Sequence, residues 1–299
     1  MIKKLCCLMF VLLLIGCMKT DAMTMIVPFG NPQLSQLYLQ NQEHYHVDVV
    51  IGADPLVTAF GSASHDVIFA PVNLGARFFQ SKEEYTLLGV VTWGNYFLIS
   101  ERELSLETIK DQTVIVFGRN QVSDILMKII NEYHQLNLTF EYVDSMSSAA
   151  AEAMLNPQKI VLISDPSYTQ LRLNNPLFNG LELHGLYQDA SSNHLLPQAG
   201  VFVHKRLTLQ QKSQIQADII TSIHRLTTHQ EMMINLAKTY GITWSSEVLI
   251  QVFTSNQLTF VSSMDAKPSV EVFFQHILTY QPQLMNNELP HEGFYGGLS

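Results

Sequence analysis

The sequence predicts an α/β protein of two lobes, each a sheet of mainly parallel strands packed between helices. Two runs in which strand patterns alternate with helix patterns support this prediction, one beginning at residue 24 and one spanning about 113–190. Parallel strands need a crossover, usually a helix, so this alternation favours parallel sheets. Between the runs, the apolar stretch 87–100 is long enough to leave one lobe and enter the other. We therefore expect two βα lobes joined by two crossing strands.

The first lobe is organised around Asp66–Ala76, which has the sequence DVIFAPVNLGA. Residues 67–70 are apolar and partly β-branched, as in a strand buried on both faces. Pro71 cannot donate to a ladder and ends this strand, and Asn73 is a good N-cap for the helix that follows. Ligands of open α/β sheets lie in the crevice beyond the carboxyl ends of the strands. The turn Ala70–Asn73 is therefore predicted to form one lip of a binding site.

The other elements of the first lobe follow from the same patterns of apolar residues and turn signals. Two prolines make the loop after the first strand rigid and leave Phe29 exposed in it. Before this loop we expect a strand at 24–27, and after it a strand at 45–51 and a helix from Asp54-Pro55 to about 62.

The second lobe repeats the strand–turn–helix pattern. We expect its strands at 113–117, 138–143 and 159–163, a helix capped by Ser105, and a returning strand at 199–204. The rest of the chain is mostly helical, with a helix at about 269–281 and capping-box spacing at Thr208–Gln211 and Thr228–Glu231. The expected division is 24–98 and 201–299 for lobe one and 99–200 for lobe two.

The first 23 residues are predicted to lie outside the fold. Lys3 and Lys4 precede an apolar run that is too short for a stable membrane span and ends in Leu14-Ile15-Gly16-Cys17. This ending resembles the lipobox of bacterial lipoproteins. The resemblance implies a signal peptide at 1–16, acylation of Cys17 and a tether over 17–23; an ordinary signal peptide with an unrelated cysteine is the alternative. All 3 cysteines of the chain lie at position 17 or before, which excludes disulfides and a cysteine nucleophile from the fold.

Composition excludes several classes of function. The formal net charge is −9 and the few basic residues are scattered, so nucleic-acid binding is not expected. With 47% hydrophobic and 14% charged residues, the chain favours a packed globular body over disorder. The sequence has no P-loop, dinucleotide fingerprint or G-x-S-x-G nucleophile elbow. We expect neither a cofactor nor an enzymatic activity.

In this order of elements the chain resembles the solute-binding proteins of ABC importers that have the type II periplasmic-binding fold. Within them it is most similar to the receptors for nitrate, sulfonates and thiamine-pyrimidine precursors. Three stretches carry the resemblance: the strand and turn at 66–73, LSLETIKDQTV at 104–114 and LPHEGFY at 289–295. The resemblance implies two lobes that close on a small-molecule solute by a hinge motion. It also implies a monomer, held by its lipid on the outer face of the cell membrane, that delivers the solute to a permease and its ATPase.

Candidate ligand-binding residues of lobe one lie where its strands end. An aromatic pair with nearby amides suits a flat heterocycle, which stacks and takes a few hydrogen bonds. Trp93, on the crossing strand, could alternatively pack in the core. The candidates are Phe29, Gly30, Asn31, Asn73, Trp93 and Asn95.

Candidate residues of lobe two follow two of its strands. A helix N-terminus with Arg119 nearby suits an anion such as a sulfonate, although a solvated capping turn is the alternative. Asp165 could cap a helix or accept a hydrogen bond from an amino group of the ligand. The candidates are Arg119, Asn120, Gln121, Ser123, Ser164 and Asp165. The solute therefore stays open between a pyrimidine-like heterocycle and a sulfonate.

Two other functions stay open at this point. His44, His46 and Asp48 alternate along a predicted strand and share one face, where they could hold a metal ion, as in a metal-receptor lipoprotein. An enzyme built on the same two-lobe fold is the second alternative.

Overall fold

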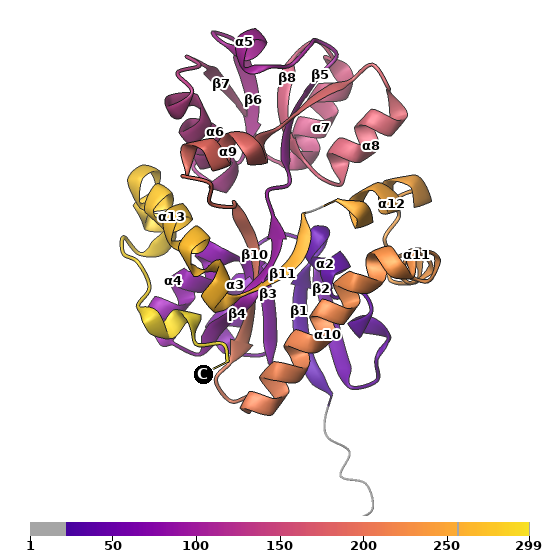
Figure 1. Ribbon diagram of the computed structural model, residues 1–299, viewed down its shortest axis with the longest axis vertical. Helices are drawn as coiled ribbons and strands as arrows, with labels where there is room; N and C mark the ends of the chain where they lie inside the picture. The colour runs from indigo at the N-terminus through magenta and orange to yellow at the C-terminus, as the bar shows by residue number, and fades with distance from the viewer. Residues whose placement is uncertain (1–21, 256, 299) are drawn as a thin grey trace, which may run out of the picture.

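The computed structural model describes residues 22–255 and 257–298, and within these ranges the strands form two sheets, one in each lobe. Figure 1 shows the two lobes stacked along the long axis of the molecule. The predicted signal peptide, Cys17 and most of the predicted tether lie outside the described residues. No described helix combines the length and apolar character needed to cross a membrane.

The larger sheet consists of β1 (Met23–Pro28), β2 (Tyr45–Val50), β3 (Val67–Pro71), β4 (Tyr85–Trp93), β10 (Pro197–His204) and β11 (Leu258–Ser262). Their order across the sheet is β11-β4-β10-β3-β1-β2. β1 pairs in parallel with β2 and β3, whereas β10 runs antiparallel between β3 and β4 and β11 runs antiparallel to β4. The parallel pairing predicted for the first three strands and the predicted returning strand are both confirmed.

β3 is buried on both faces, as its sequence predicts. Val67 and Phe69 pack in one core cluster together with Ile215 of a covering helix, while Ile68 and Ala70 pack in the cluster on the opposite face. This follows from the alternation of side chains along a strand. Apolar residues must therefore stand at every position of a strand that is covered on both sides.

The helices of the larger lobe cover both faces of its sheet (Figure 1). They are α2 (Asn31–Ser35), α3 (Asp54–Ser62), α4 (Val72–Lys82), α10 (Leu209–Thr228), α11 (Gln230–Thr239), α12 (Ser246–Thr254) and α13 (Ser263–Tyr280), with the 3₁₀ turns η1 (Leu39–Asn41), η2 (Pro282–Met285) and η3 (Glu292–Tyr295).

Predictions about helix caps in this lobe have mixed outcomes. The capping box of Thr208 and Gln211 is confirmed at the start of α10. The capping box expected at Thr228 is wrong, because Thr228 belongs to the last turn of α10 and its hydroxyl donates to the carbonyl of His224. Asn73 is not an N-cap either. The helix begins directly at the end of β3, so Pro71 takes the cap position and Asn73 lies inside the first turn.

The smaller sheet has the order β7-β6-β8-β5-β9 and carries its helices on both faces. Its strands are β5 (Tyr96–Ser100), β6 (Thr113–Phe117), β7 (Thr139–Val143), β8 (Ile160–Ser164) and β9 (Asn179–Glu182). Its helices are α5 (Leu106–Ile109), α6 (Val122–Tyr133), α7 (Met146–Leu155), α8 (Ser167–Asn174) and α9 (Leu183–Ala190). β6 pairs in parallel with β7 and β8, and β5 runs antiparallel to β8 and β9. The predicted Ser105 cap of α5 is confirmed.

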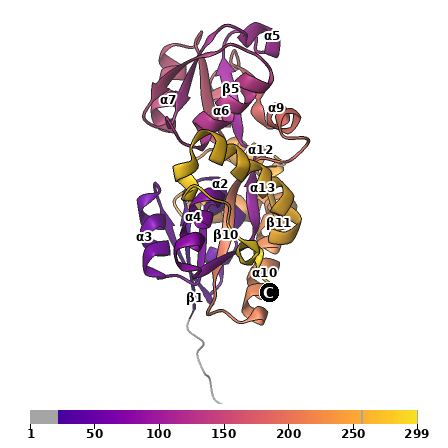
Figure 2. The same ribbon diagram turned by 90° about the vertical axis from the view of Figure 1, so that its left-hand side faces the viewer.

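The chain passes between the sheets first at Gly94–Asn95 and again over residues 191–196. The apolar stretch 87–100 is therefore two strands, one in each sheet, rather than a single strand. The lobes also meet outside these connections, where α12 contacts α8 on one side and α13 contacts α6 on the other. Figure 2 shows α13 directly beneath the smaller lobe.

Candidate ligand-binding site between the lobes

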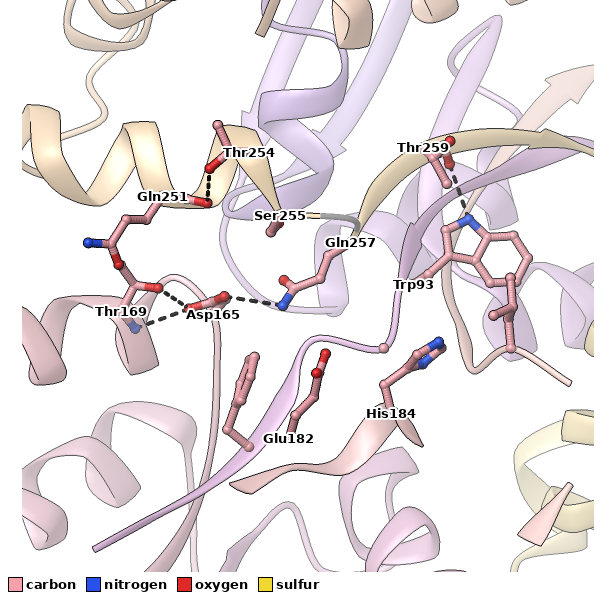
Figure 3. Close-up of a pocket in the computed structure, with 13 residues that line it drawn as sticks. Trp93, Asp165, Thr169, Glu182, His184, Gln251, Thr254, Ser255, Gln257 and Thr259 are labelled. Carbon is pink, nitrogen blue, oxygen red and sulfur yellow. Dashed lines mark hydrogen bonds between the residues drawn. The ribbon is translucent and has the colours of Figure 1, made fainter. Parts of the chain in front are cut away.

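A cavity of about 670 Å³ lies between the lobes, beside the first crossing of the chain (Figure 3). We call it the interlobe cavity. Both lobes contribute to its wall: the larger through the end of β4 and the segment from α12 to β11, the smaller through β5, β9 and the start of α8. The lining residues are Trp93, Gly94, Phe97, Asp165, Thr169, Glu182, His184, Leu195, Gln251, Thr254, Ser255, Gln257 and Thr259.

Trp93 ends β4 and is held in place from the neighbouring strand. Its indole Nε1 donates to the carbonyl of Thr259 in β11, 3.1 Å away, and the residue is only 3% exposed. Satisfying the indole N–H fixes the ring plane at the cavity wall. The two roles weighed from the sequence, core packing and wall of a site, are therefore combined in one side chain.

Asp165 follows β8 and is 7% exposed at the cavity. Its Oδ1 accepts from the backbone N–H of Thr169 at 3.1 Å and from the Thr169 hydroxyl at 2.7 Å. Its Oδ2 accepts from Nε2 of Gln257 at 3.2 Å, a contact from the other lobe. All three donors are neutral, and burial raises the pKa of the Asp165 carboxyl.

Glu182, at the end of β9, supplies a second acid. Its carboxylate has no hydrogen bond or ion pair with any other described residue, and Figure 3 shows it pointing into the cavity. Burial raises the pKa of Glu182, and the negative charge of Asp165 raises it further. These two carboxyls are the acidic groups of a cavity whose described lining contains no Lys or Arg.

His184 packs against the first crossing of the chain at Gly94. A Cβ at position 94 would lie 1.9 Å from Nδ1 of His184, and Gly94 has φ +37°, so the position requires glycine for two reasons. Nδ1 of His184 is buried without a hydrogen-bond partner among the described residues, and burial lowers the pKa of the imidazole. His184 is therefore neutral near pH 7 and leaves the negative charge of the cavity uncompensated.

Of the residues predicted from the sequence, Trp93 and Asp165 line the cavity. Asn95 lies next to it: its carbonyl accepts from the N–H of Asp165 at 3.0 Å, and its side-chain Nδ2 donates weakly to the carbonyl of Asp165. Ser164 pairs with Tyr96 at the end of the β5–β8 ladder. These two residues position Asp165 but do not themselves form the cavity wall.

The predicted loop at 28–32 lies one layer behind the cavity. Nδ2 of the buried Asn31 is 3.5 Å from Oε1 of Gln257, whose Nε2 reaches Asp165. Phe29 packs on Trp244, with ring centroids 5.3 Å apart, and Gly30 occupies the N-cap position of α2. Asn73 is also buried away from the cavity, and its side-chain oxygen has no partner among the described residues.

Arg119, Asn120, Gln121 and Ser123 lie at the other edge of the lobe interface, in a segment that we call the α6 corner (residues 118–124). Asp124, which is fully buried, occupies the N-terminus of α6. Its carboxylate accepts from the N–H of Asn120 at 2.8 Å, from Lys128 at 2.8 Å and from the Tyr142 hydroxyl at 2.8 Å.

The guanidinium of Arg119 is also engaged, lying 4.2 Å from the ring centroid of Tyr142. The Ser123 hydroxyl donates to the carbonyl of Phe117, and Asn120 accepts from Gln281 of the larger lobe at 2.9 Å. Gln121 is exposed and takes the N-cap position of α6. The seat that we expected for a ligand anion is therefore filled by a carboxylate of the same helix.

Four further lining residues are not among those predicted from the sequence: Glu182, His184, Gln257 and Thr259. Glu182 ends β9, His184 lies in α9, Gln257 directly precedes β11 and Thr259 lies in it, and neither strand is expected from the sequence. The signal was available for β11, because residues 258–261, LTFV, combine β-branched and aromatic residues at apolar–polar alternation. β9 has only 4 residues and begins Asn-Gly, which reads as a turn.

The three residues considered for a metal do not converge. His46 and His65 both approach Asp48, at 3.4 and 3.1 Å, whereas His44 approaches Asp218 at 3.7 Å. Among the described residues, no group of three or more His, Cys, Asp or Glu side chains is placed to hold a metal ion.

Comparison with solved structures assigns the fold. An ABC transporter protein from Parabacteroides distasonis is 17% identical with a TM-score of 0.81, covering 92% of this chain and 98% of its own. The periplasmic aliphatic sulphonate-binding protein of Escherichia coli is 14% identical with a TM-score of 0.72, covering 92% of each chain. A zinc-bound ligand-binding component of a Staphylococcus aureus ABC import system is 14% identical with a TM-score of 0.62, covering 94% of this chain and 99% of its own.

At these identities the likeness establishes the fold, which is the two-lobe type II periplasmic-binding fold predicted from the sequence. No protein-family model matches the sequence, and a comparison with curated protein sequences finds no match.

Proposed function

We propose that this protein is the solute-binding subunit of an ABC importer and that it holds a small polar or heteroaromatic solute between its lobes. The observation that carries the proposal is the interlobe cavity, whose wall comes from both lobes. A pocket of about 670 Å³ is of the size that small-molecule sites have. Its aromatic wall and few polar groups are typical of such sites.

The cavity also supplies a mechanism for closure. Gln257 of the larger lobe donates to Asp165 of the smaller lobe across the cavity, and the lobes are joined there by the short connection Gly94–Asn95. A solute that contacts both lobes stabilises their closed arrangement by the contacts that it makes only there. Closure then displays one composite surface to a permease.

The sequence supports a location at the membrane for this function. The lipobox-like ending at Cys17 favours a lipid anchor, which would keep the protein on the outer face of the membrane beside its permease and ATPase. We expect the binding unit to act as a monomer and without catalysis.

Mass spectrometry of the small molecules released by denaturing the purified protein tests the proposal. We expect one organic solute per chain from the wild type, its loss from the Trp93→Ala variant, and its retention by Trp244→Ala, the matched change at the other tryptophan. Retention by Trp93→Ala would place the solute elsewhere. A metal ion without an organic solute would favour the metal-receptor alternative, and turnover of the released compound by the protein would favour an enzyme.

If the purified protein is empty, a thermal-shift screen of small polar and heteroaromatic compounds replaces the first measurement, because a bound ligand raises the melting temperature. A screen in which no compound stabilises the wild type more than Trp93→Ala would contradict the proposal.

A further inference from the structure

Resting on the proposed function, we propose that the interlobe cavity selects a small organic cation with N–H donors and rejects anions of the same shape. The wall of the cavity contains acids without a cationic side chain. Asp165 and Glu182 are ionisable acids, His184 is neutral, and the described lining contains no Lys or Arg. Neither acid forms an ion pair with a described residue.

The two carboxylates keep capacity to accept hydrogen bonds from a solute. Oδ1 of Asp165 is taken by two donors of Thr169, in the first turn of α8. Oδ2 has one partner, Gln257, which belongs to the opposite lobe. An N–H of a solute can therefore replace Gln257 without disturbing the smaller lobe. Glu182 is a fully open acceptor, and Figure 3 shows it between Asp165 and His184.

Trp93 and Phe97 form the aromatic wall of the cavity. The Trp93 ring is fixed through its Nε1, and with only 3% of the residue exposed it presents a rigid apolar wall at its edge and not a free face for stacking. Phe97 adds apolar wall but is already stacked on Tyr168, with centroids 3.9 Å apart. Apolar wall and two carboxylates without a cationic partner together suit an organic cation, whose N–H donors reach the acids while its apolar part packs against the wall.

A sulfonate is disfavoured by the same wall. It brings three acceptor oxygens and a negative charge to a wall that has two carboxylates and only neutral donors. Like charges in a partly desolvated site repel strongly. The helix N-terminus at the cavity, that of α8, already donates the N–H of Thr169 to Asp165, and the N-terminus of α6 at the other edge of the interface carries Asp124.

Three probes of nearly the same shape separate the charge classes: benzamidinium is a cation with N–H donors, benzamide is neutral and benzoate is an anion. Their binding is followed by tryptophan fluorescence in a Trp244→Phe chain, whose remaining tryptophan is Trp93. We expect benzamidinium to bind at least about tenfold more tightly than benzamide or benzoate, because a charge-assisted hydrogen bond supplies that difference.

Glu182→Gln is the discriminating variant because it removes a charge and keeps the shape of the side chain. We expect it to weaken benzamidinium binding about tenfold or more and to leave benzamide unaffected. Glu247→Gln, an exposed acid of α12 outside the cavity lining, is the matched control and should change neither.

Three results would overturn the cation assignment: benzoate that binds as tightly as benzamidinium, a preference unaltered by Glu182→Gln, or no benzamidinium binding at about 10 mM, which would detect even a Kd of about 1 mM. These results leave the proposed function separately testable. A stoichiometric sulfonate released from the protein would support a solute receptor and overturn the cation, whereas the failure of every compound to stabilise the protein would overturn the receptor itself.

Discussion

The α6 corner and the interlobe cavity both place a buried carboxylate beyond a strand of the smaller lobe, but they balance its charge differently. Asp124 in the corner accepts from an ammonium, a phenol and a backbone amide of its own lobe. Asp165 in the cavity accepts only from neutral donors, and Glu182 beside it from no described residue. A buried charge is tolerated when it is paired and hydrogen-bonded. The corner is therefore complete by itself, whereas the cavity leaves negative charge for a solute.

The largest effect in this comparison is expected at the corner. Asp124→Ala leaves Lys128, the Tyr142 hydroxyl and the N–H of Asn120 without their shared acceptor. Because charged hydrogen bonds and buried pairs are lost together, we expect the free energy of unfolding to fall by about 3 kcal/mol in urea titrations. Asp144→Ala, an exposed acid of the same lobe, is the control and should cost less than about 0.5 kcal/mol. Equal effects of the two variants would show that the corner is not a structural charge network.

The next effect is expected at Gly94, in the first crossing of the chain beside the cavity. Gly94→Ala forces a Cβ against the ring of His184 and strains a backbone with φ +37°. We expect a loss of about 2 kcal/mol in the free energy of unfolding. Adding His184→Ala removes the steric part of this loss but not the backbone part, so a double-mutant cycle should recover about half of it. A Gly94→Ala protein as stable as the wild type would contradict this account of the crossing.

Asp165→Asn should change how the free energy of unfolding depends on pH more than it changes the magnitude of that free energy. Burial raises the folded-state pKa of Asp165 above its ordinary value of 3.8. The folded protein therefore keeps this proton to higher pH than the unfolded chain does, and the contribution of Asp165 to stability falls as pH rises through that window.

The variant lacks this contribution. In urea titrations between pH 4 and pH 7, its stability relative to the wild type should rise with pH by on the order of 1 kcal/mol in the empty protein. A relative stability that falls with pH would mean that Asp165 is compensated by a charge that the structure does not place there.

Glu182→Gln should have the smallest effect on the empty protein. Its carboxylate has no described partner, so no interaction is lost, and the repulsion from Asp165 disappears. We expect a change within about 0.5 kcal/mol of the wild type in thermal unfolding at pH 7. A loss of more than 1 kcal/mol, on the scale of a lost hydrogen bond, would mean that Glu182 serves the fold rather than a solute.

The sequence predicts the fold well because the signals of the fold are local. The continuous apolar run at 67–70 requires a strand covered on both faces, and alternating strands and helices require parallel pairing. Asp165, which lines the cavity, was predicted for the same reason, since it follows a strand that the pattern marks clearly, whereas Trp93 was predicted from its place in the stretch that crosses between the lobes.

The rest of the cavity depends on contacts between distant segments. Gln257 and Asp165 are 92 positions apart and meet only when the lobes meet. Arg119 looked like part of an anion seat because the sequence does not show that Asp124, in the first turn of α6, folds back onto the N–H of Asn120. Whether a charge is compensated inside the chain is a property of the packed structure, and no spacing rule supplies it.

The most direct test of the account is the distance between the lobes at the cavity edge. Pulsed electron paramagnetic resonance measures that distance between spin labels at Leu173→Cys in α8 and Glu247→Cys in α12. The 3 native cysteines are replaced in this chain. With saturating amounts of the molecule released from the purified protein, we expect a shorter and narrower distance distribution than in the empty protein. A distribution that is unchanged by the bound molecule would contradict the trapping of a solute between the lobes.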